Sequence, residues 1–200
     1  MKDLDLIIIA TNNKGKLNEF KEILNKLSIR IESLNEYEQV FDIEEDGQTF
    51  EENAIKKAET ICNLLNKPTI ADDSGLMVDM LNGLPGIYSA RFAGEDKSDQ
   101  KNNEKLLTML QGVKLNDRKA EFVCAIALAI PKEPTIVVKG SVNGLIALKP
   151  QGTNGFGYDP LFYLPEYDKT MAELKPEEKN KISHRALALE ELFSVLGKRK

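Results

Sequence analysis

The chain contains few of the residues that form disulfide frameworks or bind soft metals. Its 200 residues include one histidine, His184, two cysteines, Cys62 and Cys124, and no tryptophan. A disulfide framework needs paired cysteines at regular spacings, and a structural zinc site needs about four thiolate or imidazole ligands, so the composition argues against both. Any metal bound here should be a hard ion with oxygen ligands, Mg²⁺ or as a substitute Mn²⁺.

Long hydrophobic runs are also absent. The longest uninterrupted apolar run, residues 122–130, has nine residues, which is too short to cross a bilayer. The first ten residues carry two acids and five consecutive apolar residues, unlike a secretory signal peptide. We therefore expect a cytoplasmic protein that does not enter a membrane.

Basic residues are outnumbered by acidic ones. Lys and Arg total 27 against 32 Asp and Glu, which gives a net charge of −5. A protein that coats nucleic acid needs a large basic surface, so we expect no nucleic-acid partner. A nucleotide held by a few lysines and a metal is still compatible with this charge. Because no repeat or flexible linker interrupts the chain, we expect a single domain over residues 1–200.

Hydrophobic patterning predicts an α/β protein. An apolar strand over residues 4–10, an amphipathic helix over 16–27 and an alternating strand over 29–34 form a strand–helix–strand unit. A capping box from Thr49 to Glu52 opens a helix that should run to about Asn66. A short strand over 69–71 follows.

The remaining elements complete this organisation. Ser98 is expected to cap a helix that reaches Leu110, and strands over 121–130 and 135–148 should pair as a hairpin. A last helix over 183–196 should stop at Gly197. We expect the basic tail, residues 198–200, to be solvated.

The first candidate site is the segment Thr11-Asn12-Asn13-Lys14-Gly15-Lys16, between the first strand and helix. Free backbone N–H groups at such a junction favour an anion, and the lysines add positive charge. The segment lacks the GxxxxGK[ST] pattern of a P-loop. It therefore predicts either a phosphate site or an ordinary strand-to-helix turn.

The second candidate site is the pair Asp72 and Asp73, followed by Ser74 and Gly75. Successive residues of a regular strand point to opposite faces, so both acids reach one ligand only if the chain bends after them. Ser74 and Gly75 would permit that bend. Adjacent carboxylates at a buried strand end require a cation, which favours a functional pair over a turn cap.

Two weaker signals precede this pair. Glu45 lies in the acidic loop Glu44-Glu45-Asp46 and could supply a third oxygen ligand to the same metal, although alone it reads as solvated. Lys57 shares a helix face with Asn53 four residues earlier, which by itself suggests a surface lysine.

Two C-terminal segments could bind a base. Gly155-Phe156-Gly157-Tyr158-Asp159-Pro160 places an aromatic residue between glycines, so its ring could be either a stacking platform or a buried turn residue. Ser183 is a good N-cap, and His184 and Arg185 follow it with Lys179 nearby. These donors suit recognition of a phosphate or carbonyl oxygen, although a single histidine is often structural.

Taken in order, these motifs resemble the inosine triphosphate pyrophosphatase family. The similarity runs from Ile8 to Arg185. Six segments carry it: Ala10-Thr11-x-Asn13-x-Gly15-Lys16, Gly47-x-Thr49-Phe50-x-Glu52-Asn53-Ala54-x-x-Lys57-Ala58, Ala71-Asp72-Asp73-Ser74-Gly75-Leu76, Leu84-Pro85-Gly86-Ile87-Tyr88-Ser89-Ala90-Arg91, Gly155-Phe156-Gly157-Tyr158-Asp159-Pro160 and Glu178-Lys179-x-x-Ile182-Ser183-His184-Arg185. One small departure is Asn12, where many relatives have glycine.

The resemblance implies a fold, a reaction and a set of residue roles. The fold would be an elongated mixed β-sheet with flanking helices and two lobes around a cleft, usually in a homodimer. The reaction would be Mg²⁺-dependent cleavage of ITP, dITP or XTP between the α and β phosphates, which cleanses the nucleotide pool. The implied roles begin with the phosphates: residues 11–16 hold them, Lys16 and Lys57 neutralise them, and Ser74 also binds the substrate. Glu45, Asp72 and Asp73 would hold Mg²⁺, and Asp73 would accept the proton of the attacking water. The residues that would bind the purine are Phe156, Gly157, Tyr158, Asp159, Lys179, His184 and Arg185.

Two other functions fit the same residues. A pyrophosphatase of modified or pyrimidine nucleotides, similar to the Maf-like enzymes, would share the chemistry and differ in its base. A non-catalytic nucleotide-binding module would need Lys16 and Phe156 but no carboxylate cluster.

Overall fold

The computed structural model describes residues 5–24, 29–37 and 43–198. The chain divides into two compact units. Unit 1 comprises Met1–Asp73, Cys124–Gly140 and Arg185–Lys200, and unit 2 comprises Ser74–Val123 and Ser141–His184.

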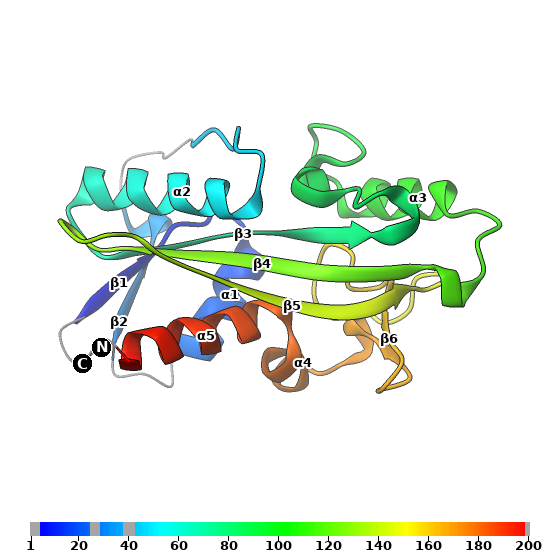
Figure 1. Ribbon diagram of the computed structural model, residues 1–200. Helices are drawn as coiled ribbons and strands as arrows, with labels where there is room; N and C mark the ends of the chain where they lie inside the picture. The colour runs from blue at the N-terminus through cyan, green and yellow to red at the C-terminus, as the bar shows by residue number, and fades with distance from the viewer. Residues whose placement is uncertain (1–4, 25–28, 38–42, 199–200) are drawn as a thin grey trace. The chain divides into compact units, whose positions relative to one another are not determined.

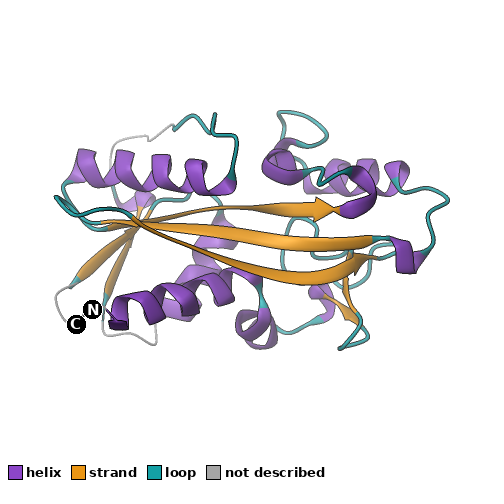
Figure 2. Ribbon diagram, in the orientation of Figure 1, coloured by secondary structure: helices purple, strands orange, loops and turns teal. Residues whose placement is uncertain are grey.

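The described residues form one mixed sheet of seven strands in the order β2-β1-β3-β4-β5-β6-β7 (Figures 1 and 2). Strand β1 (Leu6–Ile9) pairs in parallel with β2 (Arg30–Ser33) and β3 (Thr69–Val78). Strand β6 (Phe162–Leu164) pairs antiparallel with β5 (Ile136–Ile146) and with β7 (Lys169–Thr170). β4 (Lys119–Ala129) lies beside β5 in this order, which confirms the predicted hairpin. The predicted mixed α/β sheet is thus confirmed.

In unit 1 the helices cover both faces of the sheet (Figures 1 and 2). α1 (Lys14–Leu24) and α5 (His184–Lys198) lie on one face, and α2 (Phe50–Leu65) lies on the other. Phe20 of α1 and Leu189 of α5 are fully buried in one apolar cluster with Ile126 of β4. Burial of such side chains is the main favourable term in folding, so both helices are held firmly against the strands.

Helix α2 begins and ends where its local sequence predicts. The Thr49 side chain accepts a hydrogen bond from the Glu52 backbone N–H at 3.1 Å, and the Glu52 carboxylate accepts one from the Gln48 N–H at 2.7 Å. Asn66 ends the helix in the left-handed conformation at φ 50°. Local hydrogen bonds therefore set the bounds of the helix that carries Asn53 and Lys57.

Unit 2 has its own apolar core. Leu106 of α3 (Asp99–Met109) is fully buried with Leu76, Phe122 and Phe162. The Ser98 side chain accepts from the Lys101 backbone N–H at 3.3 Å, as expected for the N-cap of this helix. Helix α4 (Pro176–Ile182) and strands β6 and β7 were not predicted, because segments of two to seven residues carry too little periodicity.

Several predicted boundaries differ from the structure, and three of these differences involve the candidate site or a predicted helix end. β3 does not stop at Ala71 and bend: it continues through Ser74 and Gly75 to Val78. α1 begins two residues earlier than Lys16. α5 does not stop at Gly197, because that glycine does not adopt the left-handed backbone of a helix stop and the helix runs on to Lys198. Of the predicted segments, residues 4, 25–27 and 199–200 lie outside the described residues.

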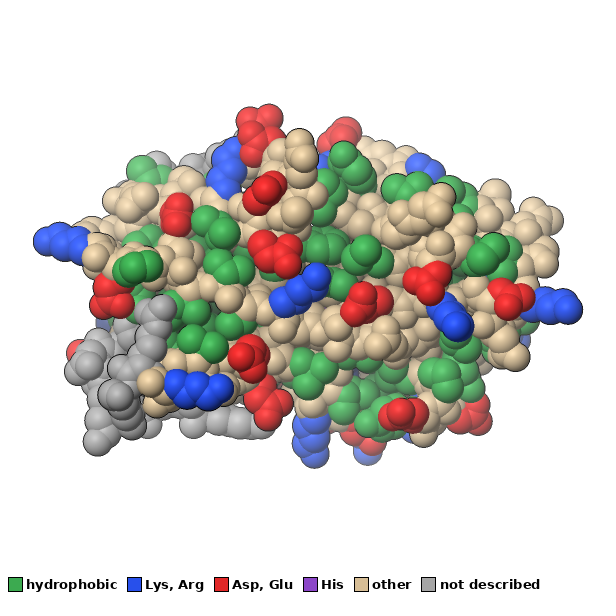
Figure 3. Space-filling model, in the orientation of Figure 1, with side chains coloured by type: hydrophobic (Ala, Val, Ile, Leu, Met, Phe, Trp, Pro, Cys, Tyr) green, Lys and Arg blue, Asp and Glu red, His purple; other side chains and the backbone are tan. Residues whose placement is uncertain are grey.

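The described part of the chain contains no helix of the length and hydrophobicity needed to span a membrane. On the face drawn in Figure 3, acidic and basic side chains are interspersed with hydrophobic ones. That mixture agrees with the modest net charge of −5.

Candidate active site

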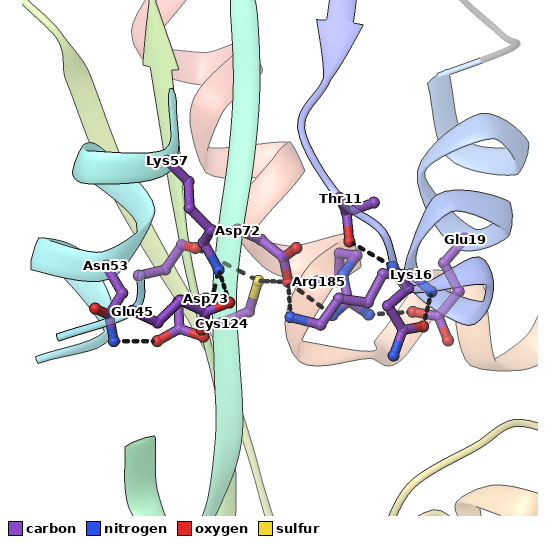
Figure 4. A network of polar contacts seen from close by, with 12 residues as sticks. Thr11, Lys16, Glu19, Glu45, Asn53, Lys57, Asp72, Asp73, Cys124 and Arg185 are labelled. Carbon is purple, nitrogen blue, oxygen red and sulfur yellow. Dashed lines mark hydrogen bonds and ion pairs between the residues drawn. The ribbon is translucent and has the colours of Figure 1, made fainter. Parts of the chain in front are cut away.

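The two adjacent acids lie on opposite faces of β3. Because the strand stays regular through them, the Asp72 and Asp73 side chains alternate. Figure 4 shows Lys16, Arg185 and Glu19 on the side of Asp72, and Asn53, Lys57 and Glu45 on the side of Asp73. The bend expected after Asp73 is therefore absent, and the two carboxylates belong to different polar clusters.

The Asp72 carboxylate is the centre of a buried ion-pair network in unit 1. Its Oδ2 lies 3.0 Å from Lys16 Nζ and accepts a hydrogen bond from Arg185 Nη2 at 2.9 Å. Arg185 Nη1 also donates to Glu19. Burial opposes the charge on Asp72, but Lys16 and Arg185 outweigh it and hold the pKa of Asp72 far below its ordinary value.

The same network determines the charge of Lys16. Burial tends to lower the pKa of Lys16, but the Asp72 carboxylate more than offsets burial, and the pKa is raised above its ordinary value. Lys16 therefore stays protonated with its ammonium directed at Asp72. Cys124 Sγ lies 3.9 Å from Asp72 Oδ2, and burial followed by the charge of Asp72 raises the pKa of this thiol. Cys124 is consequently an inert packing residue.

The Asp73 carboxylate has a different environment. Asn53 Nδ2 donates to Asp73 Oδ2 at 2.9 Å, and Lys57 Nζ lies 3.7 Å from Asp73 Oδ1. Glu45 Oε1 is 3.4 Å from the same ammonium. Burial raises the pKa of Asp73 above its ordinary value, and Lys57, Lys16 and Asn53 offset only part of that effect. A carboxylate with a raised pKa is a better proton acceptor than an ordinary aspartate.

The predicted phosphate segment is a strand-to-helix turn, as expected. Thr11, Asn12 and Asn13 connect β1 to α1, and Lys14, Gly15 and Lys16 form the first turn of the helix. Asn13 Oδ1 accepts from the Lys16 backbone N–H at 3.0 Å, and Thr11 Oγ1 accepts from the Asn13 N–H at 3.2 Å. These bonds organise a helix N-terminus, where backbone N–H groups favour an anion.

The predicted base platform lies in unit 2. Gly155 and Gly157, on either side of Phe156, have φ values of 77° and 61°, which favour glycine. A Cβ atom on Gly155 would lie 2.0 Å from Asp159 Oδ2. Asp159 Oδ2 accepts from the Phe156 N–H at 2.9 Å, and Lys179, which is paired with Asp159, has its ammonium 5.0 Å from the centre of the Phe156 ring.

Five of the other residues expected to bind the base are buried, whereas Phe156 and Gly157 are partly exposed. The Tyr158 hydroxyl donates to the Ser89 carbonyl at 2.9 Å, and the buried His184 ring stacks on Phe122 at 4.8 Å. Arg185 is only 1% exposed and its guanidinium binds Asp72 and Glu19. Ser183 has an extended backbone between α4 and α5, the conformation of an N-cap. Ser74 is partly buried within β3.

The oxygen donors beside Lys57 have the chemistry that Mg²⁺ requires. Glu45 and Asp73 supply two carboxylates on one face of β3. Mg²⁺ is commonly bound by one or two carboxylates, with substrate phosphates and water completing its octahedron. Within residues 5–24, 29–37 and 43–198, no three His, Cys, Asp or Glu side chains are grouped closely enough to hold a metal ion. Glu45 and Asp73 match the one or two carboxylates of such a site, at which substrate phosphates would supply further oxygen ligands.

Sequence reasoning missed three contributors to these clusters. Glu19 stands outside the apolar stripe of α1, so nothing in the pattern suggests that it pairs with Arg185. Asn53 was noted only as a neighbour of Lys57, and its contact with Asp73 spans 20 residues. Asn103 of α3 holds the Gly157 carbonyl at 2.8 Å, and its position 54 residues earlier gave no signal.

A mixed α/β fold in which a strand separates two lysine–carboxylate clusters has the charges needed to bind a phosphorylated substrate. Comparison with known proteins identifies the family. The model of the Ham1 family matches residues 7–195. The chain belongs to the Ham1 family, which confirms the resemblance drawn from the six motifs.

The relatives are similar over almost their whole length. A protein of Halalkalibacterium halodurans named dITP/XTP pyrophosphatase is 56% identical over 185 residues, 92% of this chain and 95% of the relative. One of the same name from Bacillus subtilis is 56% identical over 189 residues, 94% and 96% of the two chains. The solved structure of the Staphylococcus aureus Ham1 protein has a TM-score of 0.86 and 52% identity, covering 98% of this chain and 100% of that one.

Proposed function

We propose that the chain hydrolyses deaminated purine nucleoside triphosphates, namely dITP, XTP and ITP, to the monophosphate and pyrophosphate in a Mg²⁺-dependent reaction. The names of the relatives support the first two substrates, and ITP follows from the resemblance. The observation that carries the proposal is the buried Asp73 carboxylate, which Asn53 orients and Lys57 accompanies. A non-catalytic nucleotide-binding module needs no such carboxylate cluster.

Asp73 is the proton acceptor in this proposal. Asn53 donates to its Oδ2 and Lys57 Nζ lies 3.7 Å from its Oδ1, so the carboxylate is oriented, and in this proposal it accepts a proton from water that attacks the α-phosphorus. Burial raises its pKa, which increases its basicity. Lys57 lies close enough to stabilise both this carboxylate and the phosphate oxygens that the substrate brings.

Mg²⁺, when bound, supplies charge neutralisation at the phosphate oxygens and acidifies water. Glu45 and Asp73 would hold it in our proposal. The resemblance assigns Asp72 to the metal. In this structure Asp72 Oδ2 is already paired with Lys16 Nζ and Arg185 Nη2, so in our proposal Asp72 instead holds Lys16 in place. The ammonium of Lys16 then stays near the first turn of α1, where the turn of Thr11, Asn12 and Asn13 with Lys14 and Gly15 would bind the phosphate chain.

The purine would stack on Phe156 in unit 2. Gly157, Tyr158 and Asp159 shape that loop, and Lys179 and His184 supply donors suited to an oxygen at position 6 of the base. Adenine carries an amino group there, which such donors leave unpaired at a cost. Arg185 is paired with Asp72 and Glu19, so we assign it to the carboxylate network in place of the base contact expected earlier.

The test is a panel of nucleoside triphosphates with separate detection of pyrophosphate and orthophosphate, with Mg²⁺ and with EDTA. We expect pyrophosphate from dITP, XTP and ITP, little turnover of ATP and GTP, and no turnover in EDTA. Preference for a modified pyrimidine nucleotide would instead favour the Maf-like alternative. Nucleotide binding without turnover, unchanged by Asp73→Asn, would show a binding module.

Three further expectations stay predictions. The resemblance implies a homodimer, and a cytoplasmic location and a single domain over residues 1–200 also stay predictions. Size-exclusion chromatography with light scattering tests the first of these directly.

A further inference from the structure

The first turns of α3 grip the peptide on the C-terminal side of Phe156. Asp99 Oδ2 accepts a hydrogen bond from the Gly157 backbone N–H at 2.7 Å. Asn103 Nδ2 donates to the Gly157 carbonyl oxygen at 2.8 Å. Asp99 and Asn103 are four residues apart and so share one face of the helix. Together they bind both polar groups of a single glycine.

The helix that carries this grip is itself well anchored in unit 2. The Ser98 side chain caps it, and Leu106 is fully buried. The neighbouring Asn102 accepts from the Ala93 N–H at 2.7 Å and donates to the Ala90 carbonyl at 3.0 Å. Because these contacts fix α3, Asp99 and Asn103 can hold the loop in a defined position.

The loop needs such support. Gly155 and Gly157 flank Phe156 and adopt positive φ. Glycine loses more backbone freedom than any other residue when it becomes ordered, so ordering this loop has a high entropic cost. On the N-terminal side, Asp159 accepts from the Phe156 N–H at 2.9 Å. On the other side, Asp99 and Asn103 hold Gly157. The ring is therefore held between two sets of backbone hydrogen bonds.

The Asn103 side chain also carries an unfavourable feature, a buried hydrogen-bond acceptor that is not satisfied. Its Oδ1 atom is buried and has no hydrogen-bond partner among the described residues. Reversing the amide would place that oxygen against the Gly157 carbonyl oxygen, so the orientation is set by the loop. An unpaired buried acceptor is unfavourable, and native structures contain few such groups.

We propose that Asp99 and Asn103 are positioning residues for the purine, acting by holding Gly157 so that the Phe156 ring is presented ready to stack. This inference rests on the proposed function, in which Phe156 contacts the base. A loop that is already ordered loses less entropy when the nucleotide binds. Losing the grip should therefore weaken substrate binding while leaving the chemical step intact.

The test compares Asp99→Ala and Asn103→Ala with the matched control Gln100→Ala on the same helix. Gln100 is exposed, and its amide donates to the surface residue Glu104 at 2.9 Å. With dITP and XTP we expect KM to rise about three- to tenfold in the two variants, the range one hydrogen bond gives. We expect kcat to stay unchanged, and Gln100→Ala to match the wild type. Asp99→Asn keeps an acceptor and should restore most of the affinity.

A double-mutant cycle with Phe156→Ala separates positioning from general stability. If Asp99 and Asn103 act through the ring, their KM penalties should disappear when Phe156 is already alanine. The Gly157 amide proton, observed by NMR in the nucleotide-free protein, should also shift upfield and exchange faster with solvent in Asp99→Ala. Equal KM penalties with and without Phe156, or an unchanged KM in both variants, would overturn the inference.

The same cycle distinguishes failure of this inference from failure of the proposed function, in which the purine stacks on Phe156. If Phe156→Ala raises KM but the α3 variants do not, only the positioning role of Asp99 and Asn103 fails. If Phe156→Ala leaves KM for dITP and XTP unchanged, the proposed stacking fails and the positioning role is overturned with it.

Discussion

Asp72 and Asp73 are adjacent, but replacing each by asparagine should have different effects. Asp72→Asn should mainly lower thermal stability, and Asp73→Asn should mainly lower kcat. Asp72 has a fully buried side chain with Lys16 Nζ at 3.0 Å and Arg185 Nη2 at 2.9 Å. Removing one partner of a buried ion pair leaves uncompensated charge and costs about 3–5 kcal/mol. With an unfolding entropy of about 2.1 cal/mol/K for each of the 200 residues, Asp72→Asn should lower Tm by about 7–12 °C.

Asp73→Asn should behave in the opposite way. Burial already disfavours the Asp73 carboxylate, as its raised pKa indicates, and asparagine can still accept the hydrogen bond from Asn53. We expect its unfolding free energy to stay within about 1 kcal/mol of the wild type. Loss of the general base should lower kcat by about 100- to 10,000-fold, with nucleotide affinity retained.

The assay pairs thermal unfolding with pyrophosphate release from dITP. Asp79→Asn is the control, because this exposed acid follows directly after β3 and should change neither property. Equal losses of Tm in Asp72→Asn and Asp73→Asn would refute the assignment of the two acids to different clusters. Full activity in Asp73→Asn would refute its role as the proton acceptor.

Three further predictions concern pH, metal and loop geometry. The pKa of Asp73 in the folded protein lies above its unfolded value of 3.8, so ionisation of Asp73 destabilises the fold, and this penalty is relieved as pH falls. Chemical denaturation should therefore show Asp73→Asn gaining stability over the wild type as pH rises from about 4 to about 8. A stability difference that does not change with pH would contradict this. Glu45→Gln should raise the Mg²⁺ concentration needed for half-maximal activity at least severalfold, measured by Mg²⁺ titration at saturating dITP, because one of two carboxylates loses its charge; an unchanged midpoint would remove Glu45 from the metal site. Gly155→Ala should raise KM for dITP more than Gly197→Ala does. A Cβ atom at Gly155 would lie 2.0 Å from Asp159 Oδ2, whereas a Cβ atom at Gly197 would have no other atom within 4 Å. Equal KM values in the two variants would show that the loop absorbs the change.

Several features could be predicted from the sequence because they depend on neighbouring residues. The capping box of Thr49 and Glu52 and the cap at Ser98 involve hydrogen bonds across three or four positions, so both helix starts are where the sequence places them. The turn from β1 into α1 follows from an apolar run that ends in polar residues. The six ordered motifs similarly sufficed for the family, which the match over residues 7–195 confirms.

The division of the site into two clusters could not be predicted in this way. Ser74 and Gly75 suggested a bend, but pairing of β3 with its neighbours keeps the strand extended to Val78 and sends Asp72 and Asp73 to opposite faces. Likewise, Gly197 reads as a helix stop, yet α5 passes through it. In β3 the strand pairing outweighs a weak local preference, whereas Gly197 is exposed and nothing in the structure explains why the helix passes through it.

The sequence by itself thus determined the fold class, the principal helix caps and the residue types that suit phosphate chemistry, because each depends on periodicity or on contacts within a few residues. Only the tertiary structure decided which of those residues meet. Arg185 binds Asp72 across 113 positions, Asn53 binds Asp73 across 20, and Asn103 holds Gly157 across 54. No local pattern encodes such contacts, since they exist only once the strands have placed distant helices beside one another.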